Sequence, residues 1–358
     1  MLLKWSVFCV LLCLATALVI RKGSKKNPNL KLTHRKYYSK TQQDIYKHPF
    51  EDYTLVATAD WVGQPFALVN MYVDTTEGDM FIKMCETASG PPQGGAPCYN
   101  YFKSQTYTKI NENQGMEIFK GDDMNDKYMV NLTFITHCDI ESRIGFGWPN
   151  LRKYPDDTFY PYVYFDQKPC DHKFQISLAL DGCVGQMDWG STCVSSKYPT
   201  NFVPVTSNKY WQFNLNGYTF GAIDETFSSQ AVIASMRAYI GMPKKHLTKL
   251  MGAHNITYDE EFGAYTTYCY GRLPDFKLKL QGVDLTIKPE QYMYTWLPLT
   301  NGMCVVNFED SAANGFGAEW YFGLPLMTSY CVGFDYEHAQ IGFMYNDWVA
   351  DDNSCHSN

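Results

Sequence analysis

Several common catalytic and metal-binding patterns are missing from this chain of 358 residues. It has no C-x-x-C pair, no H-E-x-x-H, no G-x-S-x-G and no phosphate-binding loop of the type G-x-x-x-x-G-K-[ST]. These absences weigh against zinc or thioredoxin-type sites, zinc proteases, α/β-hydrolases and nucleotide hydrolases. We therefore expect no metal and no cofactor.

Acidic residues are missing from the first 40 positions, which hold nine of the 30 Lys and Arg residues. The rest of the chain has 21 basic and 37 acidic residues, a net charge of −16. An acidic body argues against nucleic acid as a partner. The basic segment 21–40 leaves two alternatives open: it folds back on the acidic body, or it is a solvated tail.

Long apolar runs are also missing, and the one near the N-terminus is too short to span a bilayer. Lys4, the apolar stretch 5–14 and Ala15-Thr16-Ala17 together have the pattern of a signal peptide, residues 1–17, cleaved after Ala17. We expect no membrane association. The protein is predicted to be secreted or extracellular, or else to lie in a luminal or lysosomal compartment.

Ten cysteines remain after signal cleavage, and an even number in an exported chain indicates disulfides. They are Cys85, Cys98, Cys138, Cys170, Cys183, Cys193, Cys269, Cys304, Cys331 and Cys355. Sequence proximity alone suggests a Cys183–Cys193 pair. The sequons at Asn131 and Asn255 predict glycosylation, which fits a secretory route.

Most of the chain has the alternation typical of β-strands, and the segments 132–135, 159–165, 211–215 and 276–287 are predicted strands, the last a hairpin turned at Gln281-Gly282. Helices are few. One is predicted from Ser228 or Ser229 through Ile240, and a second from Lys244 to Met251. This composition indicates two β-rich lobes.

Two apolar runs end in similar short motifs, Val73-Asp74-Thr75-Thr76 and Ile223-Asp224-Glu225-Thr226. One such aspartate in each half of the chain suggests two related lobes that face each other. Two carboxylates across a cleft can share one proton and activate a water molecule.

These segments carry a resemblance to the pepsin-family aspartic proteases over about residues 50–348. Asp74-Thr75 stands where that family has Asp-Thr-Gly, and Phe81 stands where it has Trp. The other matching segments are Ile144 to Pro149, Phe202 to Thr206, Tyr210 to Phe213, Ala222-Ile223-Asp224, Tyr321-Phe322-Gly323, Phe334-Asp335 and Ile341-Gly342-Phe343.

The resemblance implies an all-β dominated, bilobal fold with a few short helices and an inter-lobe cleft. We expect a basic pro-like segment at 18–50, an N-terminal lobe at 51–205, a C-terminal lobe at 206–350 and a tail at 351–358. It further implies that Asp74 and Asp224 are the catalytic pair. The resemblance also implies two disulfides that are common in the family, Cys85–Cys98 and Cys269–Cys304.

Departures from the family pattern gather at the implied catalytic loops. Thr76 and Thr226 replace glycines, Glu77 and Phe227 replace orienting hydroxyl residues, and Glu225 replaces the threonine that pairs with Thr75. A Cβ at the glycine positions would crowd the two acids. The substrate-covering hairpin, sought between Tyr107 and Met116, has no Tyr-Gly pair, and a lost lid weakens catalysis.

The sequence therefore predicts a secreted, non-catalytic relative of these proteases, a monomer that binds a peptide or protein in its cleft. Two alternatives stay open: a divergent, active aspartic endopeptidase that uses Asp74 and Asp224, and a structural or storage protein on the same fold.

Overall fold

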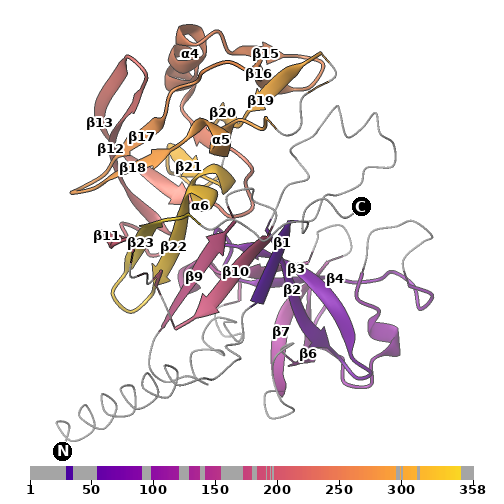
Figure 1. Cartoon of the computed structure of the whole chain (residues 1–358). Coiled ribbons are helices and arrows are strands. Elements are labelled where there is room, and N and C mark those ends of the chain that lie inside the picture. The colour runs from indigo at the N-terminus through magenta and orange to yellow at the C-terminus, as the bar shows by residue number, and fades with distance from the viewer. Residues whose placement is uncertain are drawn as a thin grey trace, which may run out of the picture.

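The computed structural model describes residues 30–34, 55–90, 98–120, 129–137, 142–154, 172–179, 184–190, 192–193, 195, 197–295, 299, 301–312 and 315–347. Strands dominate this part of the chain (Figure 1). The predicted signal peptide, the predicted strand 159–165 and the cysteines at 138, 170, 183 and 355 lie outside it. No helix among the described residues is long and apolar enough to cross a membrane.

The largest sheet contains strands from both halves of the chain. Its strand order is β11 (Thr200–Pro204), β23 (Gln340–Tyr345), β22 (Tyr330–Asp335), β9 (Lys173–Leu178), β10 (Val184–Trp189), β1 (Leu30–His34), β2 (Leu55–Val62), β3 (Ala67–Asp74), β8 (Arg143–Gly145), β4 (Met80–Lys83), β7 (Met129–His137), β6 (Gln114–Lys120) and β5 (Thr108–Lys109). In Figure 1 the indigo and purple strands of the first half lie at one end of the molecule, and β9, β10, β22 and β23 lie between them and the second half.

The second half of the chain adds two smaller sheets. One has the order β18 (Asp284–Ile287), β17 (Phe276–Lys279), β12 (Gln212–Phe220), β13 (Ile223–Ile233), β21 (Trp320–Phe322), β14 (Ile240–Met242) and β20 (Phe308–Asp310). The other has the order β15 (Thr257–Asp259), β16 (Ala264–Tyr268) and β19 (Met303–Val306). The predicted hairpin at Gln281-Gly282 is confirmed by the β17–β18 pairing, and Gly282 takes a positive φ of 81° in its turn.

The described helices are short: η1 (Tyr101–Lys103), η2 (Pro149–Leu151), α4 (Lys244–Ala253), α5 (Pro289–Tyr292) and α6 (Leu324–Ser329). The helix predicted to start at Lys244 is confirmed as α4. The helix predicted from Ser228 or Ser229 to Ile240 is wrong, because this stretch forms the end of strand β13, a turn and strand β14. Its apolar residues continue a strand that is buried on both faces near its end, a pattern that short apolar runs share with buried helices.

Each half of the chain repeats one small arrangement of four strands. In the first half, β3 runs parallel to β8, β8 antiparallel to β4, and β4 parallel to β7. In the second half, β13 runs parallel to β21, β21 antiparallel to β14, and β14 parallel to β20. Equivalent positions in the two halves can therefore be assigned from strand register alone.

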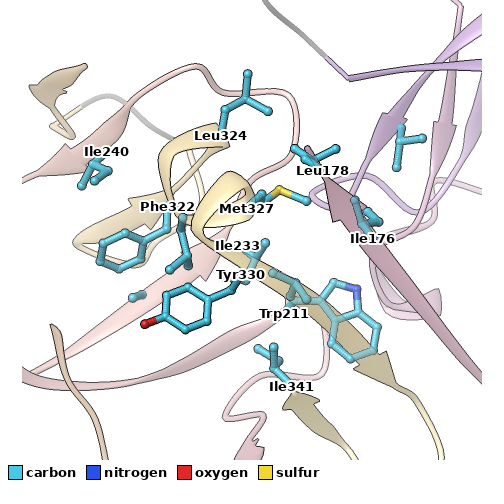
Figure 2. Close-up of a cluster of buried hydrophobic side chains, with 14 of the residues drawn as sticks. Ile176, Leu178, Trp211, Ile233, Ile240, Phe322, Leu324, Met327, Tyr330 and Ile341 are labelled. Carbon is cyan, nitrogen blue, oxygen red and sulfur yellow. The ribbon is translucent and has the colours of Figure 1, made fainter. Parts of the chain in front are cut away.

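One hydrophobic core spans both halves and includes the fully buried Trp211. Figure 2 shows Trp211 near Ile176 of β9, Ile233 at the end of β13 and Ile341 of β23. The Trp211 indole Nε1 donates to the Phe146 carbonyl at 2.6 Å, across a separation of 65 residues. This core holds the ends of β8 and β13 in place, and the candidate site lies there.

Disulfides link Cys85–Cys98 and Cys269–Cys304, which confirms the two pairs implied by the resemblance. Cys193 bonds to Cys331 on β22, with Cα atoms 5.8 Å apart. The pair Cys183–Cys193 suggested by sequence proximity is therefore wrong. Nearness along the chain did not reveal this partner, because Cys193 follows β10 and β22 reaches it through the shared sheet.

Candidate active site

Asp74 ends strand β3 and is almost completely buried, with 2% of its surface exposed. Its Oδ1 accepts hydrogen bonds from the Thr76 backbone N–H at 2.9 Å and from the Thr76 hydroxyl at 2.6 Å. Thr76 does not adopt a positive φ, so the side chain that replaces glycine causes no backbone strain. It folds onto the carboxylate and occupies one of its two oxygens.

Thr75 joins the two halves of the chain through hydrogen bonds with Ser235. The Thr75 N–H donates to Ser235 Oγ at 3.0 Å, and the Ser235 N–H donates to Thr75 Oγ1 at 3.1 Å. Each hydroxyl also donates to the opposite strand, Thr75 to the Ile233 carbonyl at 2.9 Å and Ser235 to the Val73 carbonyl at 2.6 Å. The four bonds are reciprocal, as expected of two loops related by an approximate two-fold axis.

This reciprocity makes Ser235 the counterpart of Thr75 and places Ala234 opposite Asp74. Strand register gives the same result. Val73 pairs with Ile144 on β8 and Ile233 with Phe322 on β21, and Asp74 and Ala234 follow them directly. The second loop therefore reads Ala234-Ser235-Met236-Arg237 where the first reads Asp74-Thr75-Thr76-Glu77.

The expectation that Asp224 faces Asp74 is wrong. Asp224 lies at the start of β13, pairs with Thr219 in the β12–β13 hairpin, and forms an ion pair with Lys279 with its side chain 67% exposed. Ile233 at the other end of β13 lies next to Thr75, and nine residues of extended strand span about 30 Å. Asp224 therefore cannot reach the site.

The predicted altered positions Glu225, Thr226 and Phe227 also lie away from it, in β13. Glu225 forms an ion pair with Lys249 of α4, and the Phe227 ring packs against Trp320 at 5.7 Å. The true counterparts are Ser235, Met236 and Arg237. The apolar run Ala231 to Ala234 followed by Ser235 was the signal that could have found them, but it lacks the aspartate that was sought.

A sequence model of the eukaryotic aspartyl protease domain matches residues 145–345, which is more than half of the chain. The chain belongs to this family.

Individual aspartic proteases with similar sequences support the family assignment. Aspartic protease 10 of Caenorhabditis elegans is 28% identical over 208 residues, covering 56% of this chain and 48% of the relative. Aspartic protease 1 of the same organism is 26% identical over 218 residues, covering 57% and 54%. Human gastricsin is 23% identical over 149 residues, covering 40% and 37%. The chain thus spans about half the length of the nematode aspartic proteases that it matches.

In this aspartyl protease homologue, Asp74 forms an ion pair. The Arg143 guanidinium lies 3.4 Å from Asp74 Oδ2 and stacks over the Phe81 ring, with its carbon 5.1 Å from the ring centre. Arg143 is held there because β8 pairs with both β3 and β4. Both oxygens of Asp74 are therefore engaged, one by Thr76 and one by Arg143.

Glu77 is the second carboxyl group at this end of the loop. Burial, and next the negative charge of Asp74, raise the pKa of Glu77 from 4.5 to about 7. The Glu77 backbone carbonyl accepts from the Gly147 N–H at 2.7 Å, which fixes the loop against the chain leaving β8. Glu77 is therefore protonated in acid and loses its proton near neutral pH.

We expect Glu77→Gln to make the protein more stable above pH 7. The folded state keeps the Glu77 proton up to about pH 7 and the unfolded state loses it near pH 4.5, so the unfolding free energy falls as pH rises between these values. Glutamine removes this dependence. We expect a gain of about 1–2 kcal/mol at pH 8 after allowance for solvent screening.

Urea unfolding of wild type and Glu77→Gln at pH 4 and pH 8 measures this, with Glu86→Gln at an exposed position as the matched control. Equal pH dependence in Glu77→Gln and wild type would contradict the assignment.

A long hairpin lies close to the segment where the sequence suggested that none exists. Strands β6 and β7 pair from Gln114↔Ile135 to Lys120↔Met129, and β6 begins inside the segment 107–116 that was searched. The expectation of a missing hairpin is therefore corrected. Residues 121–128, which connect β6 and β7, lie outside the described residues. Most of the hairpin lies beyond Met116, where the segment considered from sequence ends.

Buried Glu117 anchors this hairpin. Its Oε2 accepts from the Tyr99 hydroxyl at 2.7 Å and from the Ser104 hydroxyl at 2.6 Å, and its Oε1 accepts from Thr106. These donors stabilise a carboxylate that is only 1% exposed. Burial, with Glu117 nearby, raises the pKa of Tyr99.

We expect Glu117→Gln to lower the unfolding free energy by about 1–3 kcal/mol. The charge-assisted hydrogen bonds are lost, and the glutamine NH₂ group, itself a donor, replaces an oxygen that accepts from hydroxyl groups. Urea unfolding measures the loss, and Glu112→Gln, at an exposed position in the β5–β6 turn, is the control. A Glu117→Gln variant as stable as Glu112→Gln would show that the hydroxyl cluster does not anchor the hairpin.

Proposed function

We propose that this protein is a secreted, non-catalytic aspartyl protease homologue that binds a peptide or protein between its two lobes. One observation carries the proposal: Ala234 stands at the position equivalent to Asp74. Proteases of this family use two carboxylates that share one proton around a water molecule. A methyl side chain can neither hold that proton nor polarise the water.

The surroundings of Asp74 support the same conclusion. The Arg143 guanidinium lies 3.4 Å from Asp74 Oδ2, the oxygen that would otherwise be open to a water molecule or a substrate. The Thr76 hydroxyl occupies the other oxygen. Both oxygens of Asp74 are therefore engaged within the protein, which leaves Asp74 poorly placed to exchange a proton with a water molecule or a substrate.

Peptide binding is proposed because the family binds peptides in an inter-lobe cleft and the contacts between the lobes are kept. Thr75, Ser235 and Trp211 all bond across the two halves. Secretion is supported by the disulfides and by the predicted signal peptide. Asn131 and Asn255 are both exposed, which is the condition that glycosylation of the two sequons requires.

The test is proteolysis of an unfolded protein substrate from about pH 3 to 6, the range in which a shared-proton pair works. We expect wild type and Asp74→Asn to be equally inert while a labelled peptide mixture still binds wild type. Cleavage by wild type that Asp74→Asn abolishes would overturn the proposal and favour a divergent active enzyme. Inertness without peptide binding would favour a structural or storage role.

A further inference from the structure

The site around Asp74 carries two arginines, one from each half of the chain. Within the described residues, Arg143 donates one N–H to Asp74 and lies over the face of Phe81, and its positive charge also acts on Glu77. A guanidinium has five N–H groups, so most of its donor capacity is still unused. With 26% of its side chain exposed, Arg143 can still donate to a bound group.

Arg237 occupies the position in the second loop that corresponds to Glu77 in the first. It is exposed, and its guanidinium carbon lies 5.8 Å from the Phe316 ring centre and 5.6 Å from that of Tyr321. No carboxylate of the described residues lies within ion-pair distance of it. The aromatic rings hold the guanidinium in place and leave its N–H edge free to bind.

Tyr210 packs against Phe316, one of the two rings that contact Arg237. Its ring contacts Phe316 at 5.7 Å, and burial together with the nearby Glu77 carboxylate raises its pKa. Arg143 bonds to Asp74, which precedes Thr75, and Arg237 follows Ser235 by two residues. Because Thr75 and Ser235 are bonded to each other, both arginines belong to one region, the inter-lobe site, at which the family would carry two acids.

The charge of the inter-lobe site is the reverse of that expected for an aspartyl protease. Ala234 supplies no carboxylate, Arg143 neutralises Asp74, and burial raises the pKa of Glu77 to about 7, so that Glu77 is uncharged below that pH. Arg237 then adds a positive charge that has no ion-pair partner in the described part of the chain. Beyond residue 40 the chain carries a net charge of −16. An acidic body repels anions in general, so a positive site on it attracts an acidic ligand at that site alone.

We propose that the inter-lobe site recognises an acidic peptide by pairing Arg237, assisted by Arg143, with an Asp or Glu carboxylate of the ligand. This inference rests on the proposed peptide-binding function and names its ligand class. The planar guanidinium matches a carboxylate with two parallel N–H···O bonds, and the adjacent rings of Phe316 and Tyr210 offer apolar contact to the peptide on either side.

The experiment compares three labelled decapeptides that differ at two central positions, with Asp-Asp, Asn-Asn or two phosphoserines. Anisotropy titrations use wild type, Arg237→Gln and Arg272→Gln, the last an exposed arginine in the loop between β16 and β17. We expect wild type and Arg272→Gln to bind the Asp peptide about tenfold more tightly than the Asn peptide, the equivalent of about 1.4 kcal/mol. Arg237→Gln should lose this preference and bind the Asp and Asn peptides equally.

Equal binding of the Asp and Asn peptides to wild type would overturn the inference and leave the proposed function intact. So would a preference that survives in Arg237→Gln. A phosphoserine peptide that binds far more tightly than the Asp peptide would replace the carboxylate by a phosphate. Failure of all three peptides to bind would contradict peptide binding itself, and with it the inference.

Discussion

Ala234→Asp alone should leave peptide hydrolysis undetectable. The fourfold variant Thr76→Gly, Arg143→Gln, Ala234→Asp and Met236→Gly should cleave peptides at acid pH at a rate at least about 100-fold above the background measured with wild type. The single change supplies a second carboxylate, but Arg143 still forms an ion pair with Asp74 Oδ2 and Thr76 still bonds to Oδ1. Two acids share a proton only when nothing else stabilises both negative charges. Removing Arg143 and the two side chains at the glycine positions restores that condition and frees Asp74 Oδ1.

The size of the effect follows from the number of groups that change. Losing one preorganised stabilising group commonly costs about 10²–10³ in rate, and grouped effects do not multiply. Initial rates on an unfolded protein from about pH 3 to 6 measure the outcome. The control adds Asp74→Asn to the fourfold variant and should return it to background. Activity in Ala234→Asp alone would show that Arg143 and Thr76 do not block the site.

The strand pattern and the family fold could be predicted from the sequence because they depend on local alternation and on many short matches. The hairpin at Gln281-Gly282 and helix α4 were found in this way, as were two of the three described disulfides. Cys193–Cys331 was not, since its two strands come together only through sheet order. Local pattern carries no information on which distant strands are neighbours.

The second half of the candidate site was misassigned for a different reason. Asp224 follows an apolar run and so has the expected pattern, but it lies at the start of β13, whereas the loop that pairs with Thr75 begins at the other end of that strand. The retained feature was the hydroxyl of Ser235, not an acid. Hydrogen bonding across the interface identifies Ala234 as the counterpart of Asp74, and a loop without an aspartate lacks the feature on which the sequence pattern depends.

Thr75→Val and Ser235→Ala should each lower the unfolding free energy by about 1–3 kcal/mol, and together by less than the sum. Each hydroxyl accepts an N–H of the other loop and donates to a carbonyl of the opposite strand, and Thr75 is fully buried. Removing one hydroxyl leaves buried groups without partners. Removing the second then costs less, because some of its partners are already lost.

Urea unfolding of the four proteins in this double-mutant cycle gives the coupling, which we expect to be about 1–2 kcal/mol in favour of the intact pair. Thr286→Val is the matched control, since this half-buried strand threonine makes no hydroxyl hydrogen bond within the described part of the chain. Additive losses would mean that Thr75 and Ser235 act separately. In that case the reciprocal bonds would not join the lobes, and the equivalence of Ala234 with Asp74 would rest on strand register alone.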